Sequence, residues 1–312
     1  MPDQMPAPLA LPLFERITII GGGLIGSSLM RAIRQQNVAT AIIAVDRDEN
    51  VVSRIKELGI ATEATTDAKE GVTDSELVIL CVPVGSCGSV AQEIRDHLRP
   101  GVILSDVGSV KGSVISQVAP YLPEGAHLIP AHPVAGTEHS GPDAGFASLF
   151  NNRWSILTPL HDAEQAMVEK MRAFWEAIGS NVDVMEPQHH DLVLAITSHV
   201  PHLIAYNIVA TAADLEKVTQ SEVIKYSAGG FRDFTRIAAS DPTMWRDVFL
   251  HNKDAVLEML GRFNEDISVL TRAIRSGDGD ALFELFTRTR SIRRNIISQG
   301  QETDQPDFGR RR

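Results

Sequence analysis

The stretch ITIIGGGLIGSSL, residues Ile17 to Leu29, joins a β-branched apolar run to a helical pattern through glycines spaced Gly-x-Gly-x-x-Gly. Gly21 permits a tight turn, Gly23 lets the backbone approach a pyrophosphate, and Gly26 lets helix and strand pack closely. The spacing alone also occurs in glycine-rich turns with a purely structural role, so its context decides. Here a strand precedes it and a helix follows it, which predicts a dinucleotide-binding βαβ unit.

An acidic residue follows at the distance that such a unit requires. Asp46 ends the next apolar run, twenty residues after Gly26. Its carboxylate would accept hydrogen bonds from ribose hydroxyls and repel a 2′-phosphate, which favours NAD over NADP. Arg47 beside it leaves NADP open, because an arginine there can accommodate the phosphate. Leu24 and Ile25, in the first turn of the helix, complete the predicted cofactor-binding turn.

The chain divides into two parts with different periodicity. Up to about residue 186, apolar runs rich in Val and Ile alternate with amphipathic segments. The runs are RITIIGGG, AIIAVD, ELVILCVPV, GVILSDVGS, HLIPAHP and RWSILTP. Strands that alternate with helices and are apolar on both faces predict an α/β domain of the Rossmann type, a doubly wound parallel sheet, over residues 1–186.

After this first domain the β pattern stops and long helical patterns follow. They cover residues 189–215, 243–275 and 280–298, with Asp280 as the expected N-cap of the last one. Amphipathic helices of this length need a partner surface, and a second copy of the same domain would supply one. We therefore predict an all-α dimerisation domain over residues 187–312, and a homodimer.

Composition and charge narrow the possible partners. A formal net charge of −11 over 312 residues argues against general binding to nucleic acid or to an anionic membrane. No uninterrupted apolar run approaches the roughly 20 residues of a membrane span, and the N-terminal segment lacks the basic region of a signal peptide. Cys81 and Cys87 are too few for a disulfide framework, so we expect a reduced, cytoplasmic protein.

The ends of the apolar runs hold the candidate site residues, because ligands of this fold lie beyond the carboxyl ends of the strands. Val82 and Pro83 end one run, and Gly108 and Ser109 follow the next, so all four should face cofactor or substrate. His132 follows the run HLIPA and is expected on the same rim. An imidazole there can accept a proton while a hydride leaves, which predicts a dehydrogenase.

Other titratable residues are less specific. Lys111 is expected either on this rim or as a solvated or structural lysine. His199 and His202 share a helix face, and Pro201 between them should distort the helix. No carboxylate-rich or cysteine cluster accompanies the pair, so we predict no metal site. The dipeptide His189–His190 is expected in solvent.

Five segments occur together in an order that resembles one family. They are IIGGGLIGSSL, DVGSVK, HPVAGTEHSG, TSHVPHL and GGFRDFTRIAASDPTMWRDVFLHN. From about Arg16 to about Ser298 the chain resembles the TyrA group, the prephenate, arogenate and cyclohexadienyl dehydrogenases of tyrosine biosynthesis. The resemblance implies oxidative decarboxylation, in which NAD⁺ takes a hydride from ring C4 of a cyclohexadienol and carbon dioxide leaves from C1. Prephenate would give 4-hydroxyphenylpyruvate, and arogenate would give tyrosine.

The resemblance also implies roles for individual residues. His132 matches the histidine that takes the proton of the C4 hydroxyl, and Ser109 matches a serine beside that hydroxyl. His202 matches a residue near the substrate side chain, and Arg236 matches the arginine that holds a substrate carboxylate. Thr137, Glu138 and Trp245 also match family residues of the substrate site, and His199 matches the more structural member of the histidine pair. Two further candidates follow from position: Gly229 would let the backbone pass close to substrate, and Asp233 lies three residues before Arg236.

Several of these assignments keep an alternative. Trp245 matches a tryptophan that reaches the pocket from the partner subunit, but it would equally suit helix packing within its own chain. Asp233 would orient Arg236 or form an ordinary surface pair. Glu138 would close the pocket, contact the neighbouring subunit or form a surface ion pair. The residues do not decide between prephenate and arogenate, so both are expected as substrates.

Two other functions share this overall plan. β-Hydroxyacid dehydrogenases and imine reductases also join a Rossmann domain to helices, but they would carry a catalytic lysine or aspartate on the helical domain and lack HPVAGTE. A non-catalytic, NAD-sensing regulator should lack at least one reacting group. Here Ser109, His132, His202 and Arg236 are all present, which favours an enzyme.

Overall fold

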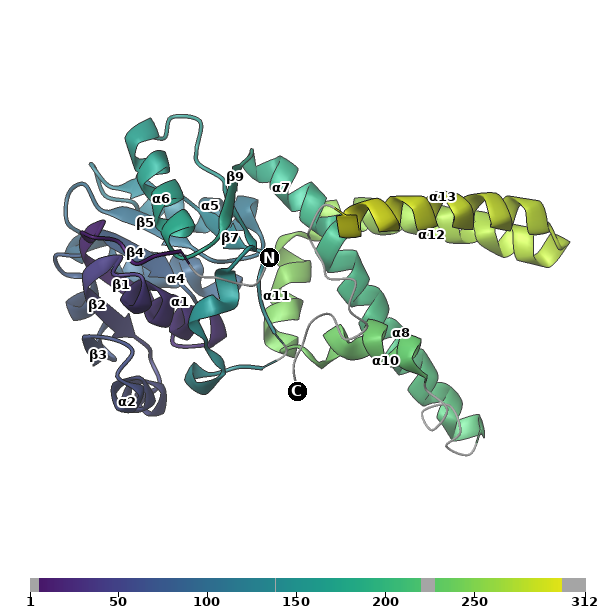
Figure 1. Ribbon diagram of the computed structural model, residues 1–312, viewed down its shortest axis with the longest axis horizontal. Coiled ribbons are helices and arrows are strands. Elements are labelled where there is room, and N and C mark those ends of the chain that lie inside the picture. Colours follow the sequence, from purple (N-terminus) through teal and green to yellow (C-terminus); the bar gives the residue numbers. More distant parts are fainter. Residues whose placement is uncertain (1–5, 138, 220–227, 299–312) are drawn as a thin grey trace. The chain divides into compact units, whose positions relative to one another are not determined.

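The computed structural model describes residues 6–137, 139–219 and 228–298 (Figure 1). The chain packs as two compact units, Met1–Val256 and Leu257–Arg312. The first unit contains both sheets and the helices that carry the predicted site residues, so the site can be followed within one unit.

A six-stranded parallel sheet forms the centre of the first unit, in the order β3-β2-β1-β4-β5-β6. Its strands are β1 (Phe14–Ile20), β2 (Ala39–Val45), β3 (Glu63–Thr65), β4 (Leu77–Leu80), β5 (Ile103–Asp106) and β6 (His127–Leu128). This confirms the predicted doubly wound parallel sheet. The strand order reverses between β1 and β4, which is where ligands of such sheets bind. The short strand β3 lacks an apolar run, so the sequence pattern does not predict it.

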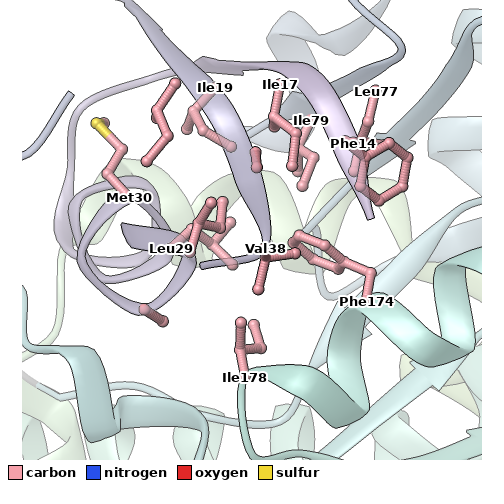
Figure 2. Packing of buried hydrophobic residues seen from close by; sticks show 14 of the residues in the cluster. Phe14, Ile17, Ile19, Leu29, Met30, Val38, Leu77, Ile79, Phe174 and Ile178 are labelled. Atoms are coloured by element: carbon pink, nitrogen blue, oxygen red, sulfur yellow. The ribbon is translucent and has the colours of Figure 1, made fainter. Parts of the chain in front are cut away.

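Helices cover both faces of this sheet, and the core lies on both sides of it. The helices of the α/β part are α1 (Leu24–Gln35), α2 (Glu49–Leu58), α3 (Ala68–Val72), α4 (Cys87–Ile94), α5 (Lys111–Val118) and α6 (Gln165–Ala177). Leu77 and Ile79 of β4 join one apolar cluster, whereas Val78 and Leu80 join the other. Figure 2 shows the first cluster, where Phe174 of α6 lies among residues of β1 and α1. Burial on both faces explains why the strands are apolar throughout.

A second, three-stranded sheet carries His132 and departs from the prediction. Its strands are β7 (Ala131–Pro133), β8 (Trp154–Leu157) and β9 (Asn181–Val184), with β7 antiparallel and β9 parallel to β8. The run HLIPAHP was expected to extend the parallel sheet and does so only through β6, because its second half forms β7. The same expectation for RWSILTP is wrong, because that run forms β8 of the second sheet. Pro130 interrupts the first run, since proline has no N–H to donate to a strand ladder.

The helical part begins with a distorted segment. Its helices are α7 (Pro187–Leu194), α8 (Val200–Thr219), α10 (Gly229–Thr235), α11 (Pro242–His251), α12 (Lys253–Ser276) and α13 (Gly279–Ser298). A π-helical turn, Ala195–His199, joins α7 to α8 and ends two residues before Pro201, which confirms the predicted distortion. Helix α7 contacts α5, and α11 contacts the 3-10 turn Val84–Ser86. Helices α7 and α11 are thereby packed beside the ends of β4 and β5.

Two details of the predicted helices are corrected. The single helix expected over residues 243–275 is broken at Asn252, between α11 and α12. The cap of α13 is Asp278 rather than Asp280, because the Asp278 carboxylate accepts the N–H of Ala281 at 3.0 Å. Asp280 lies in the first turn of that helix instead, where its negative charge suits the helix dipole.

One helical segment among the described residues, Pro187–Leu215, is long and apolar enough to cross a membrane by composition. Its most apolar window has a mean hydropathy of 1.5, and 28% of that window is buried. The segment contains no uninterrupted apolar run of that length, because polar residues are scattered along it. Helices at the interfaces of soluble proteins have the same composition, so this composition alone does not indicate that the segment spans a membrane.

Candidate active site

The glycine turn has the geometry that a dinucleotide requires. Gly21 has φ +108°, and a Cβ there would collide with the carbonyl oxygen of Cys81. A Cβ on Gly26 would collide with the carbonyl oxygen of Gly21. By contrast, no atom lies within 4 Å of a Cβ built on Gly23, the residue that precedes the first turn of α1. Two glycines are therefore required by packing, and the third leaves open space where a pyrophosphate would fit.

Asp46 is held in place at the end of β2. Its Oδ2 accepts the N–H of Gly22 at 2.7 Å, and its Oδ1 accepts the N–H of Asp48 at 3.0 Å. Arg47 is exposed beside it. The carboxylate is fixed beside the glycine turn, as expected for a group that binds the ribose of a dinucleotide.

The other predicted cofactor residues lie at the ends of β4 and β5. Val82 and Pro83 follow β4, and Gly108 follows β5. The Gly108 N–H donates to Oδ2 of Asp106 at 2.8 Å, and a Cβ on Gly108 would approach Val84 to 3.1 Å. Leu24 and Ile25 open α1 and are half-buried. All these residues share the edge of the sheet where its strand order reverses.

Lys111 is neither solvated nor placed to contact a ligand. Its Nζ forms a fully buried ion pair with Asp106 and donates to the carbonyl oxygen of Ala131 at 2.6 Å. Burial raises the pKa of the Asp106 carboxyl, and the Lys111 ammonium opposes that rise. Lys111 thereby links Asp106, at the end of β5, to Ala131 of β7, the residue before His132.

His132 is buried, with 8% of its surface exposed. Its Nδ1 lies 2.9 Å from Nε2 of His190. Burial lowers the pKa of His132 well below its usual value, and the nearby His190 and Lys111 lower it further. The imidazole is therefore neutral at neutral pH, in the state that can accept a proton.

His190 is a site residue that sequence analysis missed, and the expectation that it is exposed to solvent is wrong. The side chain is fully buried, whereas that of His189 is exposed as expected. Pro187, His190 and Leu194 are all buried and lie three and four residues apart, on one face of α7. This helical spacing was the available signal, because it places His190 with the residues that pack inward.

The two histidines of the π turn and α8 lie against Trp245. The His202 ring stacks on the Trp245 ring with centroids 3.6 Å apart, and His199 meets it edge-on at 6.1 Å. Nδ1 of His202 donates to the carbonyl oxygen of Ser198 at 2.8 Å. Burial lowers the pKa of His199 to about 4. Trp245 is thus buried against two histidines of its own chain, and its reach into a partner's pocket stays a prediction.

Asn252 connects this histidine pair to α7. Its Nδ2 donates to the carbonyl oxygen of Asp191 at 2.8 Å and lies 3.1 Å from Nδ1 of His199. Asn252 sits at the break between α11 and α12, so the break directs a buried amide toward the site. Sequence analysis predicted one continuous helix here, and the periodicity of such a helix does not indicate that Asn252 lies at the site.

Arg236 lies close enough to His202 for its charge to act there. Burial lowers the pKa of His202 below its usual value, and the positive charge of Arg236 adds to this. Asp233 is exposed on α10, and Arg236 begins the 3-10 turn that follows. The role of Asp233 in orienting Arg236 stays a prediction. Gly229 opens α10, with open space around its Cα.

Three predicted residues remain near the rim. Ser109 is half-buried in the turn between β5 and α5. Thr137 is exposed, and its Oγ1 accepts the N–H of His139 at 3.3 Å. Glu138 lies outside the described residues. Their contacts with substrate stay predictions.

A neutral, buried imidazole near a dinucleotide-binding edge can take a proton while a hydride leaves the same substrate, which is the chemistry of Rossmann-fold dehydrogenases. Residues 29–184 match the family model for the prephenate dehydrogenase nucleotide-binding domain, and residues 186–288 match that for the prephenate dehydrogenase dimerization domain. The chain belongs to the prephenate dehydrogenase family. It is a dehydrogenase of tyrosine biosynthesis that uses a nicotinamide dinucleotide.

Individual relatives agree over most of their length. The chain is 43% identical to a cyclohexadienyl dehydrogenase of Zymomonas mobilis over 91% of this chain and 96% of that protein. It is 32% identical to a prephenate dehydrogenase of Bacillus subtilis, over 89% and 75% respectively. Its fold is similar to the crystal structure of prephenate dehydrogenase from Aquifex aeolicus in complex with hydroxyphenyl propionate and NAD⁺, with a TM-score of 0.85, 30% identity, and coverage of 90% and 98%.

Proposed function

We propose that this chain is a cytoplasmic, homodimeric enzyme that oxidatively decarboxylates prephenate, arogenate or both with NAD⁺. The observation that carries the proposal is the neutral, buried His132, placed beside the carboxyl end of β5 by the Lys111 bond to Ala131. NAD⁺, when bound, accepts the hydride from ring C4. Prephenate would yield 4-hydroxyphenylpyruvate, and arogenate would yield tyrosine.

The chain's own residues bind and orient the substrate and move one proton. Nε2 of His132 accepts the proton of the C4 hydroxyl, with the Ser109 hydroxyl beside it. The guanidinium of Arg236 holds a substrate carboxylate, which its planar pair of N–H donors suits better than a lysine would. His202, fixed by Trp245 and Ser198, borders the substrate side chain.

The preference for NAD⁺ over NADP⁺ rests on Asp46. Its carboxylate is oriented by two backbone N–H groups beside the glycine turn, where it would repel a 2′-phosphate. The exposed Arg47 is the residue through which NADP⁺ would be accommodated instead. The cofactor comparison below separates these two possibilities.

A homodimer through the helical domain is supported by apolar side chains that α12 and α13 leave exposed. These are Leu257, Ile267, Val269, Ile274, Phe283, Phe286 and Ile292. The match of residues 186–288 to a dimerization domain supports the same arrangement. We propose domains over residues 1–186 and 187–312, since the two family models meet close to that boundary.

The test follows NADH or NADPH formation by the purified protein with prephenate and with arogenate, each with NAD⁺ and NADP⁺. We expect turnover of both substrates with NAD⁺, and the ratio of kcat/KM values measures both preferences. The His132→Asn variant should still bind NAD⁺ while its kcat falls by about 10²–10⁴-fold. Lack of turnover with all four pairs, by protein that binds NAD⁺, would contradict the proposal, as would full activity of the variant.

A further inference from the structure

A chain of three side chains runs from His132 to a carboxylate. Nδ1 of His132 lies 2.9 Å from Nε2 of His190, and Nδ1 of His190 lies 2.9 Å from Oδ1 of Asp191. The two rings meet edge-on, with centroids 5.1 Å apart and planes at 73°. His132 is on β7 and the other two are on α7, so packing alone brings them together.

Asp191 is fixed by backbone hydrogen bonds. Its Oδ1 accepts the N–H of Lys111 at 2.7 Å, and its Oδ2 accepts the N–H of Gly112 at 2.8 Å, both in the first turn of α5. Both oxygens of Asp191 therefore act as hydrogen-bond acceptors. In the bond between His190 and Asp191, the hydrogen is accordingly on Nδ1 of His190.

The hydrogen on Nδ1 of His190 determines which ring donates in the bond between His132 and His190. Burial lowers the pKa of His190, so its imidazole is neutral with one hydrogen, and Nε2 is a bare acceptor. In its bond to His190, Nδ1 of His132 must therefore donate. Because His132 is also neutral, its own Nε2 has a free lone pair.

We propose that His190 and Asp191 are positioning residues that hold His132 in the tautomer with the hydrogen on Nδ1, leaving Nε2 to accept the substrate proton. The proposal rests on the proposed function, in which His132 is that acceptor. When the substrate O–H bond breaks and the Nε2–H bond forms, the resulting imidazolium keeps its Nδ1–H bond to the neutral His190. No proton has to pass beyond His132.

Other charged groups near His132 do not take over this role. Lys111 and His199 also face it from α5 and the π turn, and both lower its pKa. The ammonium of Lys111 is directed to Asp106 and the Ala131 carbonyl, and His199 is bonded to Asn252. Only His190 is hydrogen-bonded to the His132 ring within the described residues.

The test measures the tautomer without requiring turnover. In protein with ¹⁵N-labelled histidine near neutral pH, we expect the His132 shifts of a protonated Nδ1 and a bare Nε2. His190→Phe keeps a buried ring but removes the acceptor, so the His132 signals should move toward the other tautomer. The control His189→Phe changes the exposed neighbour on the same helix, and it should remove the His189 signals while leaving those of His132 unchanged.

Kinetics supply the second readout. For His190→Phe we expect kcat to fall by about 10–10³-fold, while KM and the Kd for NAD⁺ stay within about twofold. His190→Gln should recover part of the rate, because its amide oxygen can accept from Nδ1–H, and it replaces the first variant if that one does not fold. A bare Nδ1 in the wild-type protein, or unchanged kcat in a folded variant, would overturn the proposal. A protein with the expected tautomer but no turnover would instead refute the proposed function.

Discussion

The glycine turn and the histidine cluster differ in how the sequence encodes them. Gly21, Gly26 and Asp46 belong to one βαβ unit, and their roles follow from backbone geometry set by close neighbours in the chain. His132 and His190 lie 58 residues apart and meet only because α7 packs on α5. A backbone motif can therefore be recognised from spacing, whereas a side-chain cluster depends on tertiary packing that spacing does not reveal.

A buried ion pair joins the two regions. Asp106 ends β5, and the Gly108 N–H at the cofactor edge donates to it. Lys111 opens α5 and bonds to Asp106, while its backbone N–H donates to Asp191 in the histidine cluster. Disrupting the pair of Lys111 and Asp106 should therefore affect the structure of both the cofactor edge and the histidine cluster. Changes within the glycine turn should affect only the cofactor edge.

The largest effect is expected for Lys111→Met. The substitution leaves Asp106 as a buried charge without its partner, so the free energy of unfolding should fall by about 3–5 kcal/mol. Urea denaturation near neutral pH measures the change. The control Lys69→Met alters an exposed lysine on α3 and should stay within about 0.5 kcal/mol of wild type.

A double variant, Lys111→Met with Asp106→Asn, sharpens this test. It removes both charges, so it should recover much of the lost stability, because replacing a whole buried pair is far less costly than breaking it. A single variant as stable as wild type would show that the pair does not connect the two regions.

The second prediction separates packing from cofactor binding within the turn. In Gly26→Ala the methyl group meets the Gly21 carbonyl, so unfolding should become easier by about 1–3 kcal/mol. In Gly23→Ala the methyl group enters open space, so stability should change by less than about 0.5 kcal/mol while the affinity for NAD⁺ falls by about tenfold or more. Denaturation and NAD⁺ titration measure both variants. Equal destabilisation by the two would contradict this division of roles.

The sequence predicted those features that local chemistry determines. The glycine turn and the π distortion before Pro201 are confirmed, because each depends on residues close together in the chain. The parallel sheet is confirmed although β1 and β4 pair across 60 residues, because the alternation of apolar runs with helical segments is visible in the sequence itself. The second sheet was missed because Pro130 divides one apolar run between two sheets. His190 was missed because its burial depends on α7 meeting α5, and Asn252 because the helix break that exposes its amide to the site has no glycine or proline to mark it.

The smallest expected effect is the contribution of the buried histidines to the pH dependence of stability. Burial lowers the pKa of His132, His190 and His199, the last to about 4, whereas a histidine in the unfolded chain titrates near 6.5. Below pH 6.5 the unfolded chain therefore binds protons that the folded protein cannot, so stability is full above that pH and is lost as the pH falls toward 4.

One variant isolates the contribution of a single histidine. His199→Gln removes the titrating ring but keeps an acceptor for the Asn252 amide. Between pH 7 and pH 5.5, where ordinary carboxylates stay ionised, the wild type should lose about 1 kcal/mol more stability than this variant. Urea denaturation at several pH values measures the difference. Parallel pH profiles of stability for the two proteins would contradict the lowered pKa of His199. A flatter profile for the variant would show that the buried histidines make stability depend on pH. The glycine turn makes no such contribution, because its residues carry no titratable side chain.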